Sequence, residues 1–251
     1  MLHPMKKSSF IKTITQLVCL CVPLSGFAAV TFQNDGTTAG WDNHTPQHNG
    51  TISQVTSPNY KTTTANTSIK FTQTFDPNYT GRYHSEVEKD TTQSNGQDRW
   101  YGQAVYIPTS WVDTSGGNTI QQWGTEAPEG PWIQNFIQGT LLKITVPGIN
   151  NYQHMGSVTK GVWMRIVVHL KMANPGVEEA WFNGTRMFSY SNVNLYNPNG
   201  SATIRWSCGL YVTYWFGLSS LPAGDQSVRT VYHDHFRIDA LSYNGAEPAN
   251  W

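Results

Sequence analysis

The sequence predicts an all-β protein that folds as one two-sheet sandwich of the β-jelly-roll type. Short runs rich in Val, Ile, Thr, Tyr, Phe and Trp recur between clusters of Gly, Pro, Asn and Asp, whereas apolar residues at helical spacing are almost absent. No linker, low-complexity tract or repeat interrupts these runs, which indicates a single domain. Aromatic residues make up 13% of the chain and charged residues another 13%, a composition that favours a large packed core and excludes intrinsic disorder.

Ten runs have the length and composition of strands. They lie at residues 68–74, 82–88, 100–107, 118–123, 139–146, 163–172, 178–182, 186–190, 203–215 and 230–243. Asn183-Gly184 separates two of these runs and is a strong hairpin signal, so we expect a hairpin over residues 178–190. The connections at 46–60, 93–98, 125–135 and 147–159 are long, and we expect them to be loops that carry binding residues.

The first 28 residues are expected to be a cleavable signal peptide. Three lysines precede an apolar run at 14–24, and Gly26 and Ala28 follow at the −3 and −1 positions of a cleavage site. The run is shorter than the roughly 20 apolar residues that a membrane helix needs. We therefore expect residues 29–251 to form the jelly-roll domain of a secreted or periplasmic protein, in which Cys208 fills the core.

Charge balance and missing motifs narrow the function. The chain carries 16 Lys and Arg against 16 Asp and Glu, and loss of the three leader lysines leaves a net charge of −3, which argues against a nucleic-acid partner. The sequence has no phosphate-binding loop, zinc-protease motif, paired CxxC or hydrolase elbow. Because Trp and Tyr stack on sugar rings while Asn and Gln bind sugar hydroxyls, we expect a protein that binds carbohydrate. We also expect it to be a monomer.

A polar row on the expected strand 82–88 admits two catalytic interpretations. Alternation places Arg82, His84, Glu86 and Glu88 on one face. Glu86 and Glu88 could be the acid and the nucleophile of a glycosidase, which lie about 5–5.5 Å apart in retaining enzymes. Alternatively, Arg82 and His84 bind and deprotonate an acidic sugar while the carboxylates orient them. A carbohydrate-binding module without catalysis is the third possibility.

The strand at 163–171 has one apolar and one cationic face. Alternation puts Met164, Ile166, Val168 and Leu170 on the core side. Arg165, His169 and Lys171 then lie on the opposite side. We predict that these three residues and Arg82 form a cationic groove that binds an anionic polysaccharide although the whole molecule is acidic.

Seven short motifs occur in the order found in a known family. They are 82–86 (RYHSE), 98–102 (DRWYG), 105–108 (VYIP) with Trp111, 122–123 (QW), 181–184 (WFNG), 209–211 (GLY) and 232–234 (YHD). On these residues the sequence resembles the β-jelly-roll polysaccharide lyases and is most similar to the glucuronan lyase family. The resemblance implies a concanavalin-like sandwich and an endo-acting enzyme that cleaves a uronic-acid polymer, such as β-1,4-glucuronan, by β-elimination.

The same resemblance implies the catalytic residues. Gln122 would donate a hydrogen bond to the uronate carboxylate, because the transition state places more negative charge there. His84 and Tyr211 match the acid and base positions, and on a gluco-configured sugar Tyr211 would do both jobs. If the strand bulges at this point, Tyr214 takes the place of Tyr211. We expect no organic cofactor.

Asp234 is a candidate metal ligand. Alternation places it with Tyr232 and Phe236, an apolar neighbourhood in which a carboxylate needs a partner. A structural Ca²⁺ ion, which sandwiches resembling this family often carry, would supply one. The alternative is an ion pair with Arg229 or Arg237.

Overall fold

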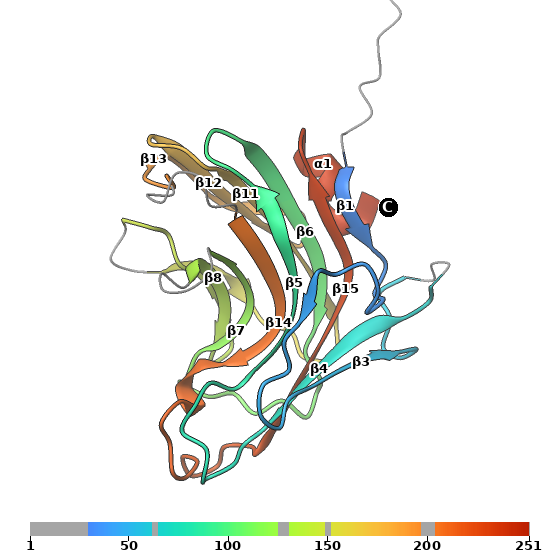
Figure 1. Ribbon diagram of the computed structural model, residues 1–251, viewed down its shortest axis with the longest axis vertical. Helices are drawn as coiled ribbons and strands as arrows, with labels where there is room; N and C mark the ends of the chain where they lie inside the picture. The colour runs from blue at the N-terminus through green and yellow to red at the C-terminus, as the bar shows by residue number, and fades with distance from the viewer. Residues whose placement is uncertain (1–29, 62–64, 125–130, 149–151, 197–203, 251) are drawn as a thin grey trace, which may run out of the picture.

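Two antiparallel sheets packed face to face make up the part of the protein that the structure describes (Figure 1). The computed structural model describes residues 30–61, 65–124, 131–148, 152–196 and 204–250. The two packed sheets confirm the predicted all-β jelly-roll sandwich. The segment predicted to be a signal peptide lies outside the described residues. None of the helices in the ranges above is long and apolar enough to cross a membrane.

The strands divide between an eight-stranded and a seven-stranded sheet. In spatial order the eight-stranded sheet contains β13 (Thr185–Val193), β12 (Gly176–Phe182), β11 (Trp163–Lys171), β6 (Asp98–Tyr106), β15 (Val228–Asp239), β4 (Ser68–Thr74) and β3 (Thr51–Val55), with β1 (Val30–Asn34) also paired to β15. The seven-stranded sheet contains β10 (Gln153–Ser157), β9 (Leu141–Ile144), β8 (Pro131–Gln138), β7 (Asn118–Gly124), β14 (Ile204–Val212), β5 (His84–Gln93) and β2 (Asn43–His44).

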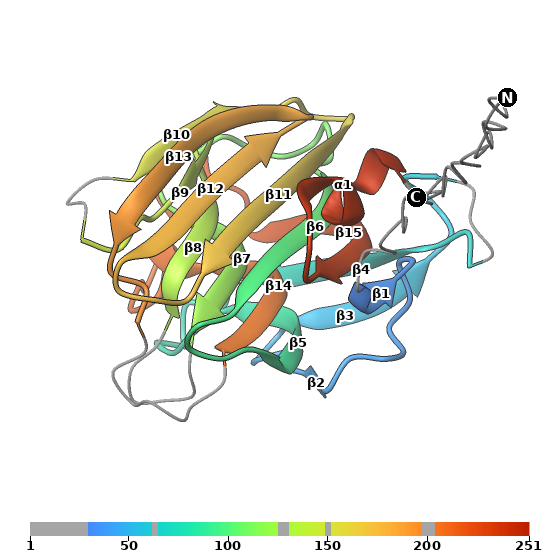
Figure 2. The ribbon, with the colours of Figure 1, turned by 90° about the horizontal axis from the view of Figure 1, so that it is seen from above.

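Both sheets curve in the same direction, and the seven-stranded sheet lies on the inner side of the curve (Figure 1). The short helix α1 (Tyr243–Ala246) lies against β6, β11 and β15, on the outer side of the eight-stranded sheet (Figure 2). Gly102 of β6 makes this contact possible, because a Cβ atom there would lie 1.6 Å from the carbonyl oxygen of Ala246. The outer face of the eight-stranded sheet is therefore partly covered, and the free face of the seven-stranded sheet is on the concave side.

The core between the sheets follows the predicted alternation of β11. Met164, Ile166, Val168 and Leu170 all belong to the buried core, which confirms the predicted apolar face. From the other sheet, β14 contributes a fully buried cysteine, Cys208, as predicted. Each large apolar side chain buried in this way contributes about 1.5–3 kcal/mol of transfer free energy.

The Asn183-Gly184 hairpin is confirmed. Both residues have positive φ, 50° and 87°, as a two-residue turn between twisted antiparallel strands requires. The turn joins β12 to β13, which pair along their length.

The ten predicted strands all fall on observed strands, but several bounds differ. The predicted range 68–74 coincides with β4. The strand β14 ends at Val212, before the end of the predicted range 203–215, because residues Thr213–Trp215 form a 3-10 turn. Three strands run through ranges expected to be loops: β3 in 46–60, β8 in 125–135 and β10 in 147–159. β10 lies at a sheet edge and its sequence, QHMGS, has no β-branched or large aromatic residue, so pairing with β9 rather than propensity makes it a strand.

Candidate functional site

Three adjacent strands of the seven-stranded sheet bring the predicted catalytic residues together. His84 begins β5, Gln122 lies on β7, and Tyr211 lies near the end of β14 between them. Tyr211 and His84 are direct cross-strand partners, with ring centroids 5.4 Å apart. The three residues face the free, concave side, because their neighbours in the sequence, Tyr83, Trp123 and Leu210, belong to the core.

Glu86 is the centre of this cluster. The Nε2 atom of Gln122 donates to both Glu86 carboxylate oxygens, at 3.0 and 2.9 Å. The two residues reach each other across β14, whose residue opposite Glu86 is Gly209. A Cβ atom at Gly209 would lie 2.2 Å from the carbonyl oxygen of Ser85, so a larger residue would force β14 and β5 apart. Glycine at this position keeps the strands close enough for the bridge.

The same carboxylate also faces His84. The Nδ1 atom of His84 lies 3.2 Å from Oε2 of Glu86, an ion-pair distance, although it lacks the alignment of a hydrogen bond. Glu86 has a side-chain exposure of 1% and His84 of 14%. A buried carboxylate beside one ring nitrogen orients the imidazole and leaves the other nitrogen, Nε2, for chemistry.

The surroundings of Tyr211 keep its hydroxyl group protonated. Burial raises the pKa of the Tyr211 phenol, the nearby Arg82 guanidinium acts to lower it, and the Glu86 carboxylate raises it further. The net shift is upward, so the hydroxyl is protonated at neutral pH. For Tyr211 to act as a base, another group must first accept its proton.

Tyr214, the predicted alternative to Tyr211, is engaged elsewhere. It lies in the 3-10 turn that follows β14, and its hydroxyl donates to Asp225 at 2.6 Å and accepts from Arg229 Nε at 2.8 Å. Burial and the Asp225 hydrogen bond raise the pKa of Tyr214 to about 12. Tyr211, beside His84, is the better candidate.

The two carboxylates of the alternative glycosidase site do share one face of β5. Glu86, however, is buried and both of its oxygens accept from Gln122. Glu88 is also buried, burial raises its pKa, and its nearest cation is Arg205, at 3.6 Å. A nucleophile must reach the sugar, so this geometry favours an orienting role for Glu86.

The prediction that four residues form one cationic groove is wrong, because the structure does not bring them together. Arg165, His169 and Lys171 lie on β11, in the other sheet from His84, and face its outer side. The Nε atom of Arg165 pairs with Glu247 at 2.7 Å. Period-two alternation identifies the polar side of a strand but not the sheet to which the strand belongs. Of the four predicted substrate-binding residues, only Arg82 lies near Tyr211.

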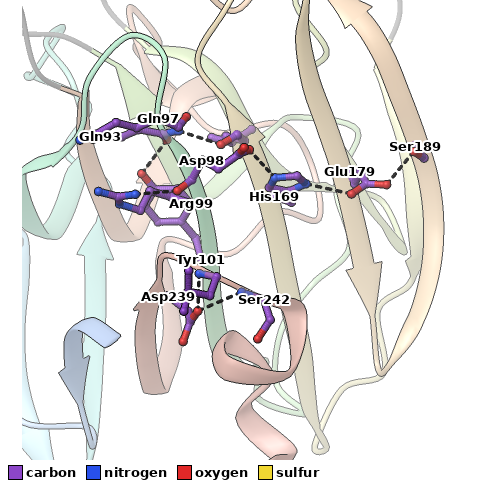
Figure 3. A network of polar contacts seen from close by, with 12 residues as sticks. Gln93, Gln97, Asp98, Arg99, Tyr101, His169, Glu179, Ser189, Asp239 and Ser242 are labelled. Atoms are coloured by element: carbon purple, nitrogen blue, oxygen red, sulfur yellow. Dashed lines mark hydrogen bonds and ion pairs between the residues drawn. The ribbon is translucent and has the colours of Figure 1, made fainter. Parts of the chain in front are cut away.

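His169 is part of a structural network instead (Figure 3). Its Nε2 atom lies 2.8 Å from Asp98 and its Nδ1 atom 2.8 Å from Glu179, while its ring stacks on Trp100 at 3.9 Å. Glu179 also accepts from Ser189 at 2.7 Å. The network ties four neighbouring strands, β6, β11, β12 and β13, together on the outer face.

Both carboxylate oxygens of Asp234 have partners within the protein. Its Oδ2 atom accepts from Tyr60 N at 2.9 Å, and its Oδ1 atom accepts from His235 N at 2.7 Å and lies 3.1 Å from the His235 ring. Among the residues placed by the structure, no group of three or more His, Cys, Asp or Glu side chains could hold a metal ion. Arg229, one predicted ion-pair partner, bonds to Asp225. Backbone N–H groups are among the partners of this carboxylate, and a calcium ion at Asp234 stays a prediction.

Sequence reasoning missed several polar residues on the concave face. Gln134 of β8 donates to Gln122 Oε1 at 3.4 Å, and Lys143 lies on β9 between two core residues. Arg205 of β14 approaches Glu88. Alternation within the predicted strand 139–146 could have found Lys143, because Leu142 and Ile144 on either side of it are apolar.

Comparison with known proteins decides the family. Residues 33–237 match the family model described as polysaccharide lyase. The chain belongs to the polysaccharide lyase family. No curated protein matches the sequence of this lyase significantly.

Solved structures support the same fold for this lyase. It is similar to endo-β-1,4-glucuronan lyase from the fungus Trichoderma reesei, with 26% identity over 88% of this chain and 100% of that chain and a TM-score of 0.79. The cellulose-induced protein Cip1 has 16% identity over 82% and 96% of the two chains, with a TM-score of 0.56. The alginate lyase vAL-1 from Chlorella virus has 12% identity over 75% and 89%, with a TM-score of 0.50. The latter two show the fold only.

Proposed function

We propose that this polysaccharide lyase cleaves β-1,4-linked glucuronan by β-elimination, with a proton relay from Tyr211. The observation that carries the proposal is the cluster in which Glu86 holds Gln122 and faces His84, beside Tyr211, on the concave face. The similarity to a glucuronan lyase over the whole of that chain favours glucuronan over other uronic-acid polymers.

In the proposed reaction, the proton leaves C5 of the uronate, a double bond forms between C4 and C5, and the C4–O4 bond breaks. The proton then ends on O4, so no other reactant is needed. Removal of the C5 proton pushes charge onto the carboxylate, which must be met by hydrogen-bond donors. Arg82 offers a guanidinium that can bind a carboxylate through two parallel hydrogen bonds. Gln122, whose amide orientation is fixed by Glu86, offers its remaining N–H.

Tyr211 would carry the proton from C5 to O4. In a gluco-configured uronate the hydrogen on C5 and the leaving oxygen on C4 lie on the same face of the ring. One side chain can therefore accept the proton from C5 and donate it to O4. Because the raised pKa of Tyr211 keeps the phenol protonated, the nearby His84 would first accept its proton through Nε2. Glu86 would stabilise the imidazolium that forms.

The test is to incubate the purified protein with a panel of polyuronates and to follow ultraviolet absorbance. A lyase releases an unsaturated, absorbing sugar end. A glycosidase releases only a reducing end, and a binding module releases nothing. We expect absorbance to rise with glucuronan, and Tyr211→Phe, which removes only the hydroxyl, to abolish turnover while circular dichroism shows an intact fold. Near-normal cleavage by that variant would contradict the relay.

We also propose that cleavage is internal to the polymer, because the similar enzyme from Trichoderma reesei is an endo-acting glucuronan lyase. Internal cleavage would lower the viscosity of a glucuronan solution long before most bonds are broken. Products that are only single unsaturated sugars from the first minutes would instead indicate action at chain ends.

A further inference from the structure

Lys143 is a buried cation on the same concave face as the candidate site. It lies on β9 between Leu142 and Ile144, which both belong to the core, so its own side chain is on the opposite, free side of the sheet. Only 7% of the residue is exposed. A charge that is so far removed from water needs compensation by its surroundings.

The protein supplies little of that compensation. The ammonium nitrogen donates to Gln138 Oε1 at 2.8 Å and lies 4.1 Å from the ring centroid of Tyr152. Within the described ranges it has no carboxylate partner, although an ammonium group has three N–H donors. The amide oxygen of Gln138 and the ring of Tyr152 do not neutralise the charge of Lys143. The ammonium group therefore still has N–H donors that can bind an anion.

The position of Lys143 relates it to the candidate catalytic residues. Lys143 is the cross-strand partner of Phe136 on β8, and Gln134 on the same strand is the partner of Gln122 on β7. Neighbouring strands are about 4.8 Å apart, and the two pairings are offset by two residues, roughly 7 Å, along β8. The Cα atoms of Lys143 and Gln122 are therefore roughly 12 Å apart. That distance places Lys143 beyond the sugar whose carboxylate Gln122 would contact.

Aromatic rings accompany the cation. The rings of Phe136 and Tyr152 meet edge to face at 5.4 Å, and Tyr152 is 40% exposed. Aromatic faces beside a charged donor are the combination that binds a sugar ring bearing a carboxylate.

We propose that Lys143 binds the carboxylate of a second uronate residue of the same polymer chain, in a subsite in which Tyr152 contacts the sugar ring. The polymer would then cross the strands of the seven-stranded sheet, from Arg82 and His84 at one side to Lys143 at the other. This proposal deepens the proposed function and rests on it for the identity of the polymer.

The test compares Lys143→Met with the matched variant Lys70→Met. Lys70 also lies between two core residues, Ile69 and Phe71, but on β4 in the other sheet. We expect Lys143→Met to raise KM for polyglucuronate roughly tenfold to a hundredfold, as for the loss of a hydrogen bond to a charged group, with kcat nearly unchanged. Lys70→Met should leave both constants unchanged, and Lys143→Arg should restore most of the affinity.

A binding measurement separates this proposal from the proposed function. Calorimetric titration of glucuronic-acid oligosaccharides into Tyr211→Phe, with and without Lys143→Met, reports affinity without turnover. If the unchanged enzyme cleaves no polyuronate but Lys143→Met still weakens binding, the reaction is wrong and the subsite stands. If Lys143→Met keeps its melting temperature and shows the same KM and dissociation constant as its parent, the subsite is wrong whatever the reaction. A proportional loss of affinity in Lys70→Met would also overturn it, because the effect would then be one of net charge.

Discussion

Replacing Glu178 by Met should stabilise this protein. Glu178 lies on β12 with 0% exposure, and neither of its carboxyl oxygens has a hydrogen-bond partner among the residues that the structure describes. An unsatisfied buried polar group costs about 1–3 kcal/mol in proteins, and Met fills a similar volume without that cost. We expect the free energy of unfolding to rise by about 1–3 kcal/mol, which for a domain of this size raises Tm by roughly 2–4 °C per kcal/mol.

The gain should depend on pH. Burial raises the pKa of Glu178 well above its ordinary value of 4.5, so the folded protein keeps a proton that the unfolded chain releases. Stability from this group is therefore greatest below about pH 4.5 and falls as the pH rises toward the folded pKa. Because Met does not titrate, the advantage of Glu178→Met should grow from acid to neutral pH, as measured by thermal unfolding at several pH values.

The neighbouring residue provides the control. Burial acts to raise the pKa of Glu179, but its bonds with Ser189 and His169 and the charge of Arg186 outweigh burial and leave the pKa lowered. Glu179→Gln should therefore destabilise the protein at neutral pH, and its effect should shrink as the pH falls through the folded pKa. If Glu178→Met lowered Tm, or if its gain were the same at every pH, the reasoning about the unpartnered carboxyl would be refuted.

Three further predictions concern the candidate site. Gln122→Ala should lower kcat by roughly 10²–10³-fold with a smaller change in KM, because one hydrogen-bond donor to a developing anion is lost. A change confined to KM would show that Gln122 only binds the substrate. Arg82→Met should raise the pKa of Tyr211 and Glu86→Gln should lower it, because Arg82 acts to lower that pKa and Glu86 to raise it. Titration of the Tyr211 ring followed by NMR measures both changes, and shifts in the same direction would contradict the assignment. Raising the ionic strength should increase KM for polyglucuronate, because the exposed side chain of Arg82 is screened over about 8–10 Å. A salt-independent KM would argue against binding through this charge.

Much of the fold could be predicted because local patterns and the final packing agree. The turn at Asn183-Gly184 and the apolar side of β11 each depend on a few consecutive residues, and both are as expected. The edge strand β10 could not be predicted, since its residues have weak strand propensity and it forms by pairing with β9.

The alternation predicted around Asp234 is wrong because the strand is irregular there. Alternation puts His233 and His235 on the face opposite Asp234, yet all three residues are buried. The register with β6 shifts between Asp234 and Arg237, and His235 has a φ of 48°, so His233 and Phe236 both face inward. A shift of one residue moves every later side chain to the other face, and period-two reading has no means of detecting it.

The candidate site was predictable in part for a similar reason. His84, Gln122 and Tyr211 could be named from motifs, and the structure places them on one face. The role of Glu86 as the group that joins them depends on the register of β5, β14 and β7, which no local pattern determines.

The placement of β14 between β5 and β7 has a consequence for folding experiments. The cluster at Glu86 exists only when β14 has paired on both sides, and its members come from strands that begin at residues 84, 118 and 204. Such long-range pairings are formed late and slowly compared with hairpins. Recovery of enzymatic activity during refolding should therefore lag behind recovery of the β12–β13 hairpin. Turnover then reports directly when β14 has paired with both β5 and β7.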